Sequence, residues 1–425
     1  MIDKRPAVVA RCRSTGDVVT ALAHARDEGL EVAVRGGGHS ISGLSSTDGG
    51  VMIDLQPMNR VVVDVDARRA HVGGGALLRD LDGTTHAHGL ATTGGMVDDT
   101  GVGGLTLGGG YGWLARLHGL ACDNVSSVEL VTASGDVVRA SEEENADLFW
   151  GIRGGGGNFG IVTEFEFRLH PIGPLLSIEL QYAPDDAPVV LREFRDLLAT
   201  APSELCGLAG MQASRGAGPL EASSTETREL GVWCVYAGPD LQQGERLVAQ
   251  LRRSARPTAE QVRVLTYPEV QSATSVASGP GRRHYWKGSL VWDLSDAFLD
   301  AFVERGTIGD GACGVEIFSL GGAIARVGEN DTAYPSRGAL FDSLAEATWD
   351  DPREDVHNMS LSRETWEALS PFVRGGVYVN DLGNDAAERV REVYGSKFER
   401  LASLKHRWDP DNTFHLNANI PPTPA

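Results

Sequence analysis

The chain has 425 residues, of which 41% are hydrophobic and 23% charged, so it can bury a large core and is long enough for two units. Its formal net charge of −20 repels phosphate backbones and anionic lipid, which argues against nucleic-acid and membrane partners. No window approaches about 18 consecutive apolar residues, and the first residues lack the layout of a secretory signal, so we expect a soluble, cytoplasmic protein.

The positions of the cysteines and glycines limit which kinds of site the protein can have. The five cysteines are scattered and form no CxxC pair, so neither a disulfide framework nor a zinc site is predicted. His86 and His88 stand two apart in a predicted helix and cannot share one face, so we expect no metal. In contrast, 53 residues are glycine, and their densest clusters lie in the first 160 positions. This indicates that the backbone there must approach another group closely.

The first region alternates helices and strands joined by short loops. A helix is predicted where apolar residues recur at helical spacing, with Asp17 as its cap. Strands are predicted where β-branched residues gather, and the Ser134-Gly135 turn joins two of them. In chain order we expect helix 17–29, strands 30–34, 51–55 and 61–65, helix 77–89, two strands within 125–141, helix 145–153 and strand 160–169.

Pro171, Gly173 and Pro174 mark a boundary, after which strands feed helices over one long unit. This pattern predicts a sheet covered on one face by helices. The expected strands are 176–182, 230–236, 284–292, 313–320 and 375–379, the expected helices are 187–200, 242–253, 296–305 and 363–369, and one or two amphipathic helices follow within 386–409.

Two glycine motifs indicate a ligand held by backbone. The first is VRGGGHSISG, residues 34–43, where glycines at a strand end can aim consecutive N–H groups at a diphosphate. The second is residues 94–113, whose apolar residues Val102, Leu105, Leu107 and Tyr111 argue against a solvated linker and favour backbone pressed against a flat ligand.

A third glycine motif, GGGGNFGIVTEF, contains a GxGxxG match at Gly155, Gly157 and Gly160. A dinucleotide-binding turn needs a helix directly after its glycines, whereas the alternating sequence that follows is typical of a strand. We therefore reject a Rossmann interpretation.

These motifs resemble a known family. RGGGHS, TGVGGLTLGGGYG followed by GLACDN, DLFWGIRGGGGNFGIVTEFEF and the closing FERLASLKHRWDPDNTFHLNANIPP are similar to the FAD-linked oxidases with a PCMH-type FAD-binding domain. Within them the sequence resembles the bacterial berberine bridge enzyme-like and 6-hydroxynicotine oxidase-like members. The resemblance covers nearly the whole chain.

The resemblance implies an α+β fold with a PCMH-type FAD-binding domain of two α/β subdomains, and a substrate domain with a large antiparallel sheet covered by helices. The FAD domain would span 1–172, completed by 395–425, and the substrate domain 173–394. By the same resemblance the residues that hold the cofactor would be Arg35, Gly36, Gly37, Gly38, His39, Ser40, Gly95, Met96, Asp98, Thr100, Gly101, Val102, Gly104, Leu105, Gly160, Val162 and Asn417.

The resemblance also implies a covalent bond between His39 and the flavin. Bicovalent members add a cysteine four residues before the first glycine of the GVGG segment, where this chain has Val97. We therefore expect one bond only. Cys122 is interpreted as a small buried hydrophobic residue.

The tail offers a separate argument for the flavin edge. Asn417 and Asn419 flank Ala418, so in an extended segment both amides would point to one face, where they can hydrogen-bond to a flavin. The alternative is a C-terminal loop whose asparagines form turns.

Candidates for catalysis lie in the second region. Glu316 is an acid in an apolar strand, where burial would raise its pKa, although it could also face solvent. Tyr378 and Asn380 match a YVN strand that the family has near its active site, and Tyr378 could exchange a proton with the substrate. Lys287 could aim its charge into the pocket or lie on the surface.

The expected activity is that of an FAD-dependent oxidase, which removes a hydride from a small organic alcohol or amine and reduces molecular oxygen to hydrogen peroxide. Thr100 occupies the position that guards oxygen access in the family, and its small side chain favours an oxidase. Two alternatives stay open, namely a dehydrogenase that uses another acceptor and a flavoprotein that sequesters a small molecule without turnover.

Overall fold

The computed structural model describes residues 2–211, 228–273, 282–308, 313–383 and 386–423. Its strands form four sheets of three, two, seven and five strands. The mixture of helices with a large antiparallel sheet confirms the expected fold class. None of the helices in these ranges is long and apolar enough to span a membrane.

The N-terminal sheet is parallel and has the order β1-β3-β2. Its strands are β1 (Val8–Arg11), β2 (Val32–Arg35) and β3 (Val51–Asp54). Helix α1 (Thr15–Asp27) buries Val18 and Leu22 against this sheet. The cap of α1 is Ser14, whose side chain accepts from the backbone N of Asp17, so the assignment of Asp17 as the cap was wrong.

The second sheet is antiparallel with the order β4-β5-β9-β7-β8. Its strands are β4 (Val61–Asp64), β5 (Arg69–Gly73), β7 (Val125–Val131), β8 (Val137–Ser141) and β9 (Ile161–Arg168). A short pair, β6 (Leu90–Ala91) and β10 (His170–Pro171), lies apart from it. The helical elements of this region are α2 (Leu78–His86), α3 (Val102–Leu107), α4 (Ala115–His118), η1 (Ala121–Asn124) and α5 (Ala146–Ile152).

The third large sheet has the order β14-β11-β13-β12-β16-β17-β15, and every neighbouring pair is antiparallel. Its strands are β11 (Leu175–Tyr182), β12 (Leu205–Met211), β13 (Leu230–Tyr236), β14 (Ala259–Leu265), β15 (Arg283–Val291), β16 (Cys313–Ser319) and β17 (Phe341–Trp349). Because side chains alternate between faces, one face packs on helices and the other turns towards the glycine-rich segments.

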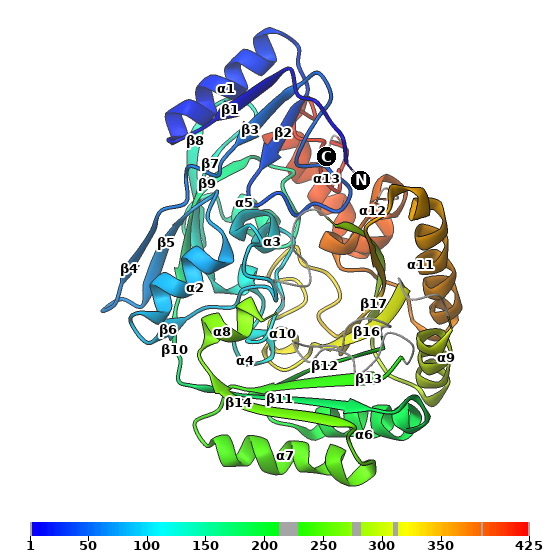
Figure 1. The fold of residues 1–425 in the computed structure, drawn as a ribbon. Helices are drawn as coiled ribbons and strands as arrows, with labels where there is room; N and C mark the ends of the chain where they lie inside the picture. Colours follow the sequence, from blue (N-terminus) through cyan, green and yellow to red (C-terminus); the bar gives the residue numbers. More distant parts are fainter. Residues whose placement is uncertain (1, 212–227, 274–281, 309–312, 384–385, 424–425) are drawn as a thin grey trace.

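Four helices cover the outer face of this sheet, as Figure 1 shows. They are α6 (Ala187–Thr200), α7 (Leu241–Ser254), α9 (Asp296–Thr307) and α11 (Asp355–Leu369). The inner face is turned towards α3 and α4 in the centre of Figure 1. Smaller elements are α8 (Tyr267–Ser272), α10 (Ala323–Arg326) and the 3-10 turns η2 (Pro184–Asp186), η3 (Pro352–Glu354), η4 (Ser370–Phe372), η5 (Val379–Asp381) and η6 (Gly395–Lys397).

The C-terminal segment returns to the first region. Helix α12 (Ala386–Tyr394) precedes α13 (Phe398–Trp408), which contacts α5. The ammonium of Lys405 is fully buried and donates to Asp409 at 2.6 Å, to the carbonyl of Asn158 at 2.8 Å and to that of Phe414 at 2.9 Å. These three bonds satisfy the buried cation and tie the tail to the third glycine motif.

The sequence missed or misplaced several elements. Residues 375–379 form no strand, because the chain turns through left-handed conformations at Gly375 and Gly376 before η5. The helix expected at 363–369 already begins at Asp355. The helix expected at 77–89 ends at His86, so His88 lies beyond it. Strands β1, β5, β12, β14 and β17 and the short pair β6 and β10 were not predicted from the sequence.

An unusual contact joins the two regions where α2 meets α8. The Asp82 carboxyl on α2 is 1% exposed, and its Oδ2 atom accepts from the Gln271 side chain at 3.3 Å, while Oδ1 has no partner among the described residues. Beside it, the hydroxyl of Tyr267 accepts from the backbone N of Gly94 at 3.2 Å. Burial raises the pKa of Asp82 from 3.8 to about 8, while Gln271 lowers it and Asp98 raises it.

We predict that Asp82→Asn stabilises the protein increasingly as pH rises. In the wild type the folded state retains a proton that the unfolded state releases between pH 3.8 and about 8, so stability falls across this window. Asparagine removes that loss, and we expect a gain of about 1–4 kcal/mol near neutral pH. Thermal unfolding measured at several pH values tests this, with the exposed Asp27→Asn as control; a difference from wild type that does not change with pH contradicts it.

Candidate functional site

The first glycine motif follows β2 and lies against the second. A Cβ placed on Gly37 would come within 2.3 Å of the backbone N of Gly101, and one on Gly101 would meet the backbone N of Gly37 at the same distance. No side chain fits at either position without moving the backbone. The Nε atom of Arg35, at the end of β2, is buried and has no hydrogen-bond partner in the described part of the chain.

A further glycine segment, residues 73–75, packs against the place where the first two motifs meet. A Cβ on Gly74 would lie 2.2 Å from the carbonyl oxygen of Val162, and one on Gly103 would lie 3.0 Å from the carbonyl oxygen of Gly74. Segments far apart in the sequence therefore meet as bare backbone. Such a cradle exposes N–H groups to a ligand, as a diphosphate requires.

His39 lies beside this crossing, and its Nε2 atom is 2.8 Å from Oδ1 of Asp99. The His39 side chain remains 36% exposed. The contact lacks the geometry of a hydrogen bond, since Oδ1 of Asp99 has no hydrogen-bond partner among the described residues, so the carboxylate acts on the Nε2 side of the ring through its charge. Sequence reasoning missed Asp99, although its position directly after Asp98 in the second motif could have indicated it.

Other expected cofactor residues lie around the same crossing. The backbone of Gly95 packs directly against Gly112. The carbonyl of Thr100 accepts a hydrogen bond from the backbone N of Leu78 at 2.9 Å. The carbonyl of Asp98 accepts one from the backbone N of Arg79 at 2.8 Å. Gly104 is exposed and has open space where a Cβ would point. The part of α3 that carries Gly104 is therefore accessible to a ligand.

Some of the expected cofactor-binding residues lie further inside the protein. Val162 is 4% exposed and its side chain lies in the hydrophobic core, so only its backbone is available to a cofactor. Gly160 packs against Leu130 and Val131 of β7. The Ser40 hydroxyl accepts from Leu44 N at 3.1 Å and so stabilises the turn that follows the first motif. The remaining expected residues, Gly36, Gly38, Met96, Val102 and Leu105, belong to these same two glycine motifs.

The tail presents unsatisfied amide oxygens. Asn417 donates from Nδ2 to the carbonyl of Phe414 at 2.9 Å, while its Oδ1 atom has no partner among the described residues. The Oδ1 atom of Asn419 is buried and likewise lacks one within those ranges. Buried polar atoms are seldom left without partners, so both amides fit the edge of a polar cofactor.

Tyr378 connects the segment before η5 to the second glycine motif. Its hydroxyl oxygen accepts from the backbone N of Gly110 at 2.9 Å and from Nδ2 of Asn380 at 2.7 Å. Asn380 also donates to the carbonyl of Leu105 at 3.2 Å. Burial raises the pKa of Tyr378 and the charge of Asp381 adds to this, whereas the two hydrogen bonds lower it. Tyr378 precedes η5, so its placement on a strand was wrong.

A buried acid pair that the sequence analysis missed lies beside Tyr378. Asp342 on β17 accepts a short hydrogen bond from the hydroxyl of Tyr111, whose ring lies 4.8 Å from that of Tyr378. Burial raises the pKa of Asp342 to about 6, although bonds from Tyr111 and Asp381 lower it. Burial and the nearby Asp342 also raise the pKa of Asp381. The clue in the sequence was an acid within the predominantly apolar run of residues 341–349.

Glu316 lies on the inner face of the large sheet. It is half-buried, whereas its strand neighbours Val315 and Ile317 are fully buried against the helices. Burial raises the pKa of Glu316, and the charges of Glu346 and Asp342 raise it further. Glu316 therefore does not face bulk solvent from the outer surface.

Lys287 is on the opposite face, so the expectation that it enters the pocket was wrong. Its neighbours at alternate positions, Tyr285 and Ser289, hydrogen-bond to Arg363 and Trp366 of α11. The Lys287 ammonium lies 5.6 Å from the ring centre of Trp366. Side-chain alternation along β15 places it on the helix-covered face.

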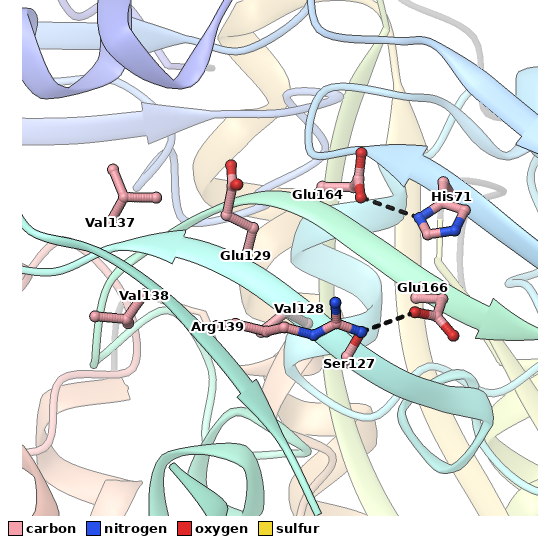
Figure 2. Close-up of a pocket in the computed structure, with 9 residues that line it drawn as sticks. All are labelled: His71, Ser127, Val128, Glu129, Val137, Val138, Arg139, Glu164 and Glu166. Atoms are coloured by element: carbon pink, nitrogen blue, oxygen red, sulfur yellow. Dashed lines mark hydrogen bonds and ion pairs between the residues drawn. The ribbon is translucent and has the colours of Figure 1, made fainter. Parts of the chain in front are cut away.

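A hollow of about 240 Å³ lies on the five-stranded sheet, away from the glycine crossing (Figure 2). Four of its charged side chains form two pairs, His71 with Glu164 at 3.1 Å and Arg139 with Glu166 at 3.2 Å. The fifth, Glu129, accepts from the hydroxyls of Thr15 at 2.7 Å and Thr163 at 2.8 Å. Because these contacts already engage the charged groups, we assign the hollow no function.

We predict that Gly101→Ala disrupts the glycine crossing. The added Cβ would overlap the backbone of Gly37, so the variant should lose about 1–3 kcal/mol of stability or more. We also expect it to purify with less bound flavin than the wild type. Gly173→Ala is a matched control, because a Cβ there meets no atom within 4 Å. Equal flavin content and unfolding temperature in both variants would show that the close approach is unimportant.

Comparison with known proteins agrees with this geometry. A family described as "FAD binding domain" matches residues 6–141, and one described as "Berberine and berberine like" matches residues 377–421. Curated relatives include (R)-6-hydroxynicotine oxidase of Paenarthrobacter nicotinovorans, 33% identical over 99% of this chain and 92% of the relative. Another is the FAD-linked oxidoreductase pgmH of Aspergillus terreus, 32% identical over 96% of this chain and 86% of the relative.

A solved structure of 6-hydroxy-D-nicotine oxidase from Arthrobacter nicotinovorans has a TM-score of 0.89 and 30% identity, covering 99% of this chain and 93% of the other. The amide oxygens of Asn417 and Asn419, which have no partner among the described residues, provide acceptors, and the bare glycine cradle beside His39 provides the space that FAD requires. The chain therefore belongs to the berberine bridge enzyme-like family of FAD-linked oxidases with a PCMH-type FAD-binding domain.

Proposed function

We propose that this FAD-linked oxidoreductase oxidises a small organic alcohol or amine and passes the electrons to molecular oxygen, forming hydrogen peroxide. The observation that carries the proposal is the double hydrogen bond to the Tyr378 oxygen from Gly110 and Asn380. It fixes a proton-exchanging group on the segment expected to line the flavin. When bound, FAD would accept a hydride from the substrate and reduce oxygen.

His39 would hold the flavin by a single covalent bond. The contact between its Nε2 atom and Asp99 supports this role, because it leaves Nδ1 as the nitrogen available for attachment. Val97 stands where bicovalent members have cysteine, so this chain has no second attachment there. Arg35 and the glycine crossing would hold the diphosphate, and Asn417 would reach the edge of the ring system.

Tyr378 would exchange a proton with the reacting O–H or N–H of the substrate. A phenol oxygen that already accepts two hydrogen bonds has one bond left to make. The neutral form would donate it to the substrate, and the ionised form would accept the substrate proton through it. Asn380 would act as a positioning residue, because it orients Tyr378 and contacts the carbonyl of Leu105.

We further propose that the FAD-binding unit comprises residues 1–172 together with the chain from about 377 onward. Val377, Val379 and Val390 lie in one hydrophobic core with the five-stranded sheet, which supports an earlier return than residue 395. The large sheet and its helices would then form the substrate unit.

The covalent bond gives one testable prediction. Wild-type protein precipitated with acid should retain flavin in the pellet, whereas His39→Ala should release it to the supernatant. Absorbance of the two fractions measures this, and Asp99→Asn should reduce the covalent fraction if Asp99 orients the ring. Flavin released by acid from the wild type would remove His39 as the attachment site.

The proposed proton exchange at Tyr378 gives a second testable prediction. Tyr378→Phe should lower kcat by about 10²–10⁴-fold while FAD stays bound. Because burial raises the pKa of Tyr378, its ionised form stays a minor species at every pH of the assay, so wild-type kcat/KM should increase with pH up to the alkaline limit without a plateau and the variant should lose that increase. Tyr285→Phe, on the helix-covered face, is the control. An unchanged alkaline limb in Tyr378→Phe would contradict this role.

Stoichiometry of peroxide and oxygen separates the proposed oxidase from its alternatives. An oxidase releases one peroxide for each oxygen consumed. A dehydrogenase would turn over only with an added acceptor such as a quinone dye, and a sequestering flavoprotein would bind ligand without bleaching its flavin. Thr100, beside the glycine crossing, is the position at which a larger residue such as leucine should slow the reaction with oxygen.

A further inference from the structure

The inner face of the large sheet has a defined pattern of residues across β15, β17 and β16. Strand register places Trp286 opposite Glu346, which is opposite Gly314. The next row contains Gly288, Leu344 and Glu316. Glu316 and Glu346 are therefore diagonal neighbours on one face, about 7–8 Å apart, a spacing that one ammonium group can bridge.

This face remains accessible at its acidic end. Trp286, Glu316 and Glu346 are each half-buried, while Asp342 is 1% exposed. Phe318, two residues from Glu316, stacks on Tyr111 of the second glycine motif at a centroid distance of 5.3 Å. The acids therefore lie on the same side of the sheet as the group of Tyr111, Asp342 and Tyr378.

Among the residues of β15, β16 and β17 themselves, those with a fixed charge on this face are all acidic. Glu316, Asp342 and Glu346 are its acids, and within the strand residues 283–291, 313–319 and 341–349 no lysine or arginine lies on it. Arg283 and Lys287 occupy the opposite face, where Arg283 pairs with Asp355. His284 shares the inner face, and its Nδ1 atom lies 3.0 Å from the hydroxyl of Thr348.

A second observation concerns the buried carboxyl of Asp381, which lies close enough to Asp342 and Trp286 for both to affect its pKa. The Oδ2 atom of Asp381 is buried and has no hydrogen-bond partner among the described residues, and the residue is only 8% exposed. It projects over the inner face, since a Cβ on Gly288 would lie 2.8 Å from this oxygen. An unsatisfied buried acceptor is costly, and a bound donor would remove that cost.

We propose that the substrate carries a basic amine, which binds as a cation between Glu316 and Glu346 with Trp286 beside it. The inference rests on the proposed function for the location of the site and selects amines over neutral alcohols and sugars within it. Indole faces attract cations, and paired carboxylates hold an ammonium by charge-assisted hydrogen bonds. A neutral hydroxyl would gain much less from the same groups.

Proton linkage is a consequence of this arrangement. Burial and the charges of Glu346 and Asp342 raise the pKa of Glu316, which favours its protonated form when no ligand is bound. A bound ammonium favours the ionised form. Amine binding should therefore release a proton to solvent near neutral pH, whereas binding of an alcohol should not.

The experiment is calorimetric titration of the anaerobic holoenzyme with matched pairs that differ only in the charged group. The probes are tyramine with tyrosol, benzylamine with benzyl alcohol, and putrescine with 1,4-butanediol. Each is titrated in two buffers of different ionisation enthalpy, so that proton release is measured directly. We expect at least one amine to bind tenfold or more tightly than its alcohol and to release protons.

Variants then identify the groups that bind the amine. Glu316→Gln should weaken binding of that amine by tenfold or more, abolish proton release and leave binding of the alcohol unchanged. Glu346→Gln should have the same direction of effect and serves if the first variant does not fold. Glu364→Gln removes an equal charge from the exposed side of α11 and should change nothing.

Three results would overturn the inference: no amine binds, each alcohol binds as tightly as its amine, or both glutamine variants bind the amine as the wild type does. Peroxide formation is assayed separately on the same samples. Proton-linked amine binding without turnover would contradict the proposed oxidase and leave the binding inference standing. Peroxide formation from a neutral alcohol, without tighter binding of any amine, would support the proposed oxidase and contradict the binding inference.

Discussion

Contact between bare backbones is the constraint on which this structure depends. Gly37 and Gly101 approach so closely that a Cβ on either would overlap the other, and Gly74 makes a similar contact with Val162. These contacts bring the end of β2, the start of α3 and the five-stranded sheet to one point. Glycine is required there because it alone leaves room for peptide groups to meet and to direct N–H donors outward.

The rest of the site is built around that crossing by long-range contacts. Lys405 anchors the tail to Asn158, which brings the unsatisfied amides of Asn417 and Asn419 to the first region. On the other side, Asn380 and Tyr378 bond to the second glycine motif. The glycine motifs thus provide a cradle for a cofactor, and the two flanking segments supply the side chains that surround it.

A group of acids that lie close to one another distinguishes the inner face of the large sheet. Ion pairs on the outer surfaces, such as Arg195 with Asp296, satisfy their charges internally. Burial instead raises the pKa of Asp342, Asp381 and Glu316, and the charge of Asp342 raises that of the other two further. Such burial is unfavourable for folding unless a proton or a ligand neutralises the acids. Perturbed acids of this kind concentrate at functional sites, and here they lie beside Tyr111 and Tyr378.

The sequence by itself determined the family, the cofactor, the class of reaction and the glycine turn with His39, because these depend on local motifs in a fixed order. It also predicted most strands of the large sheet, whose apolar runs are long. Only the tertiary structure decided which face each side chain occupies: strand pairing placed Lys287 under α11, brought Asp342 from β17 to Tyr111, and set Asp99 against His39. A shift of one residue in strand register moves each side chain to the other face of the sheet, and this decides whether a charge lies in the site. Register between distant strands cannot be derived from the local sequence pattern alone.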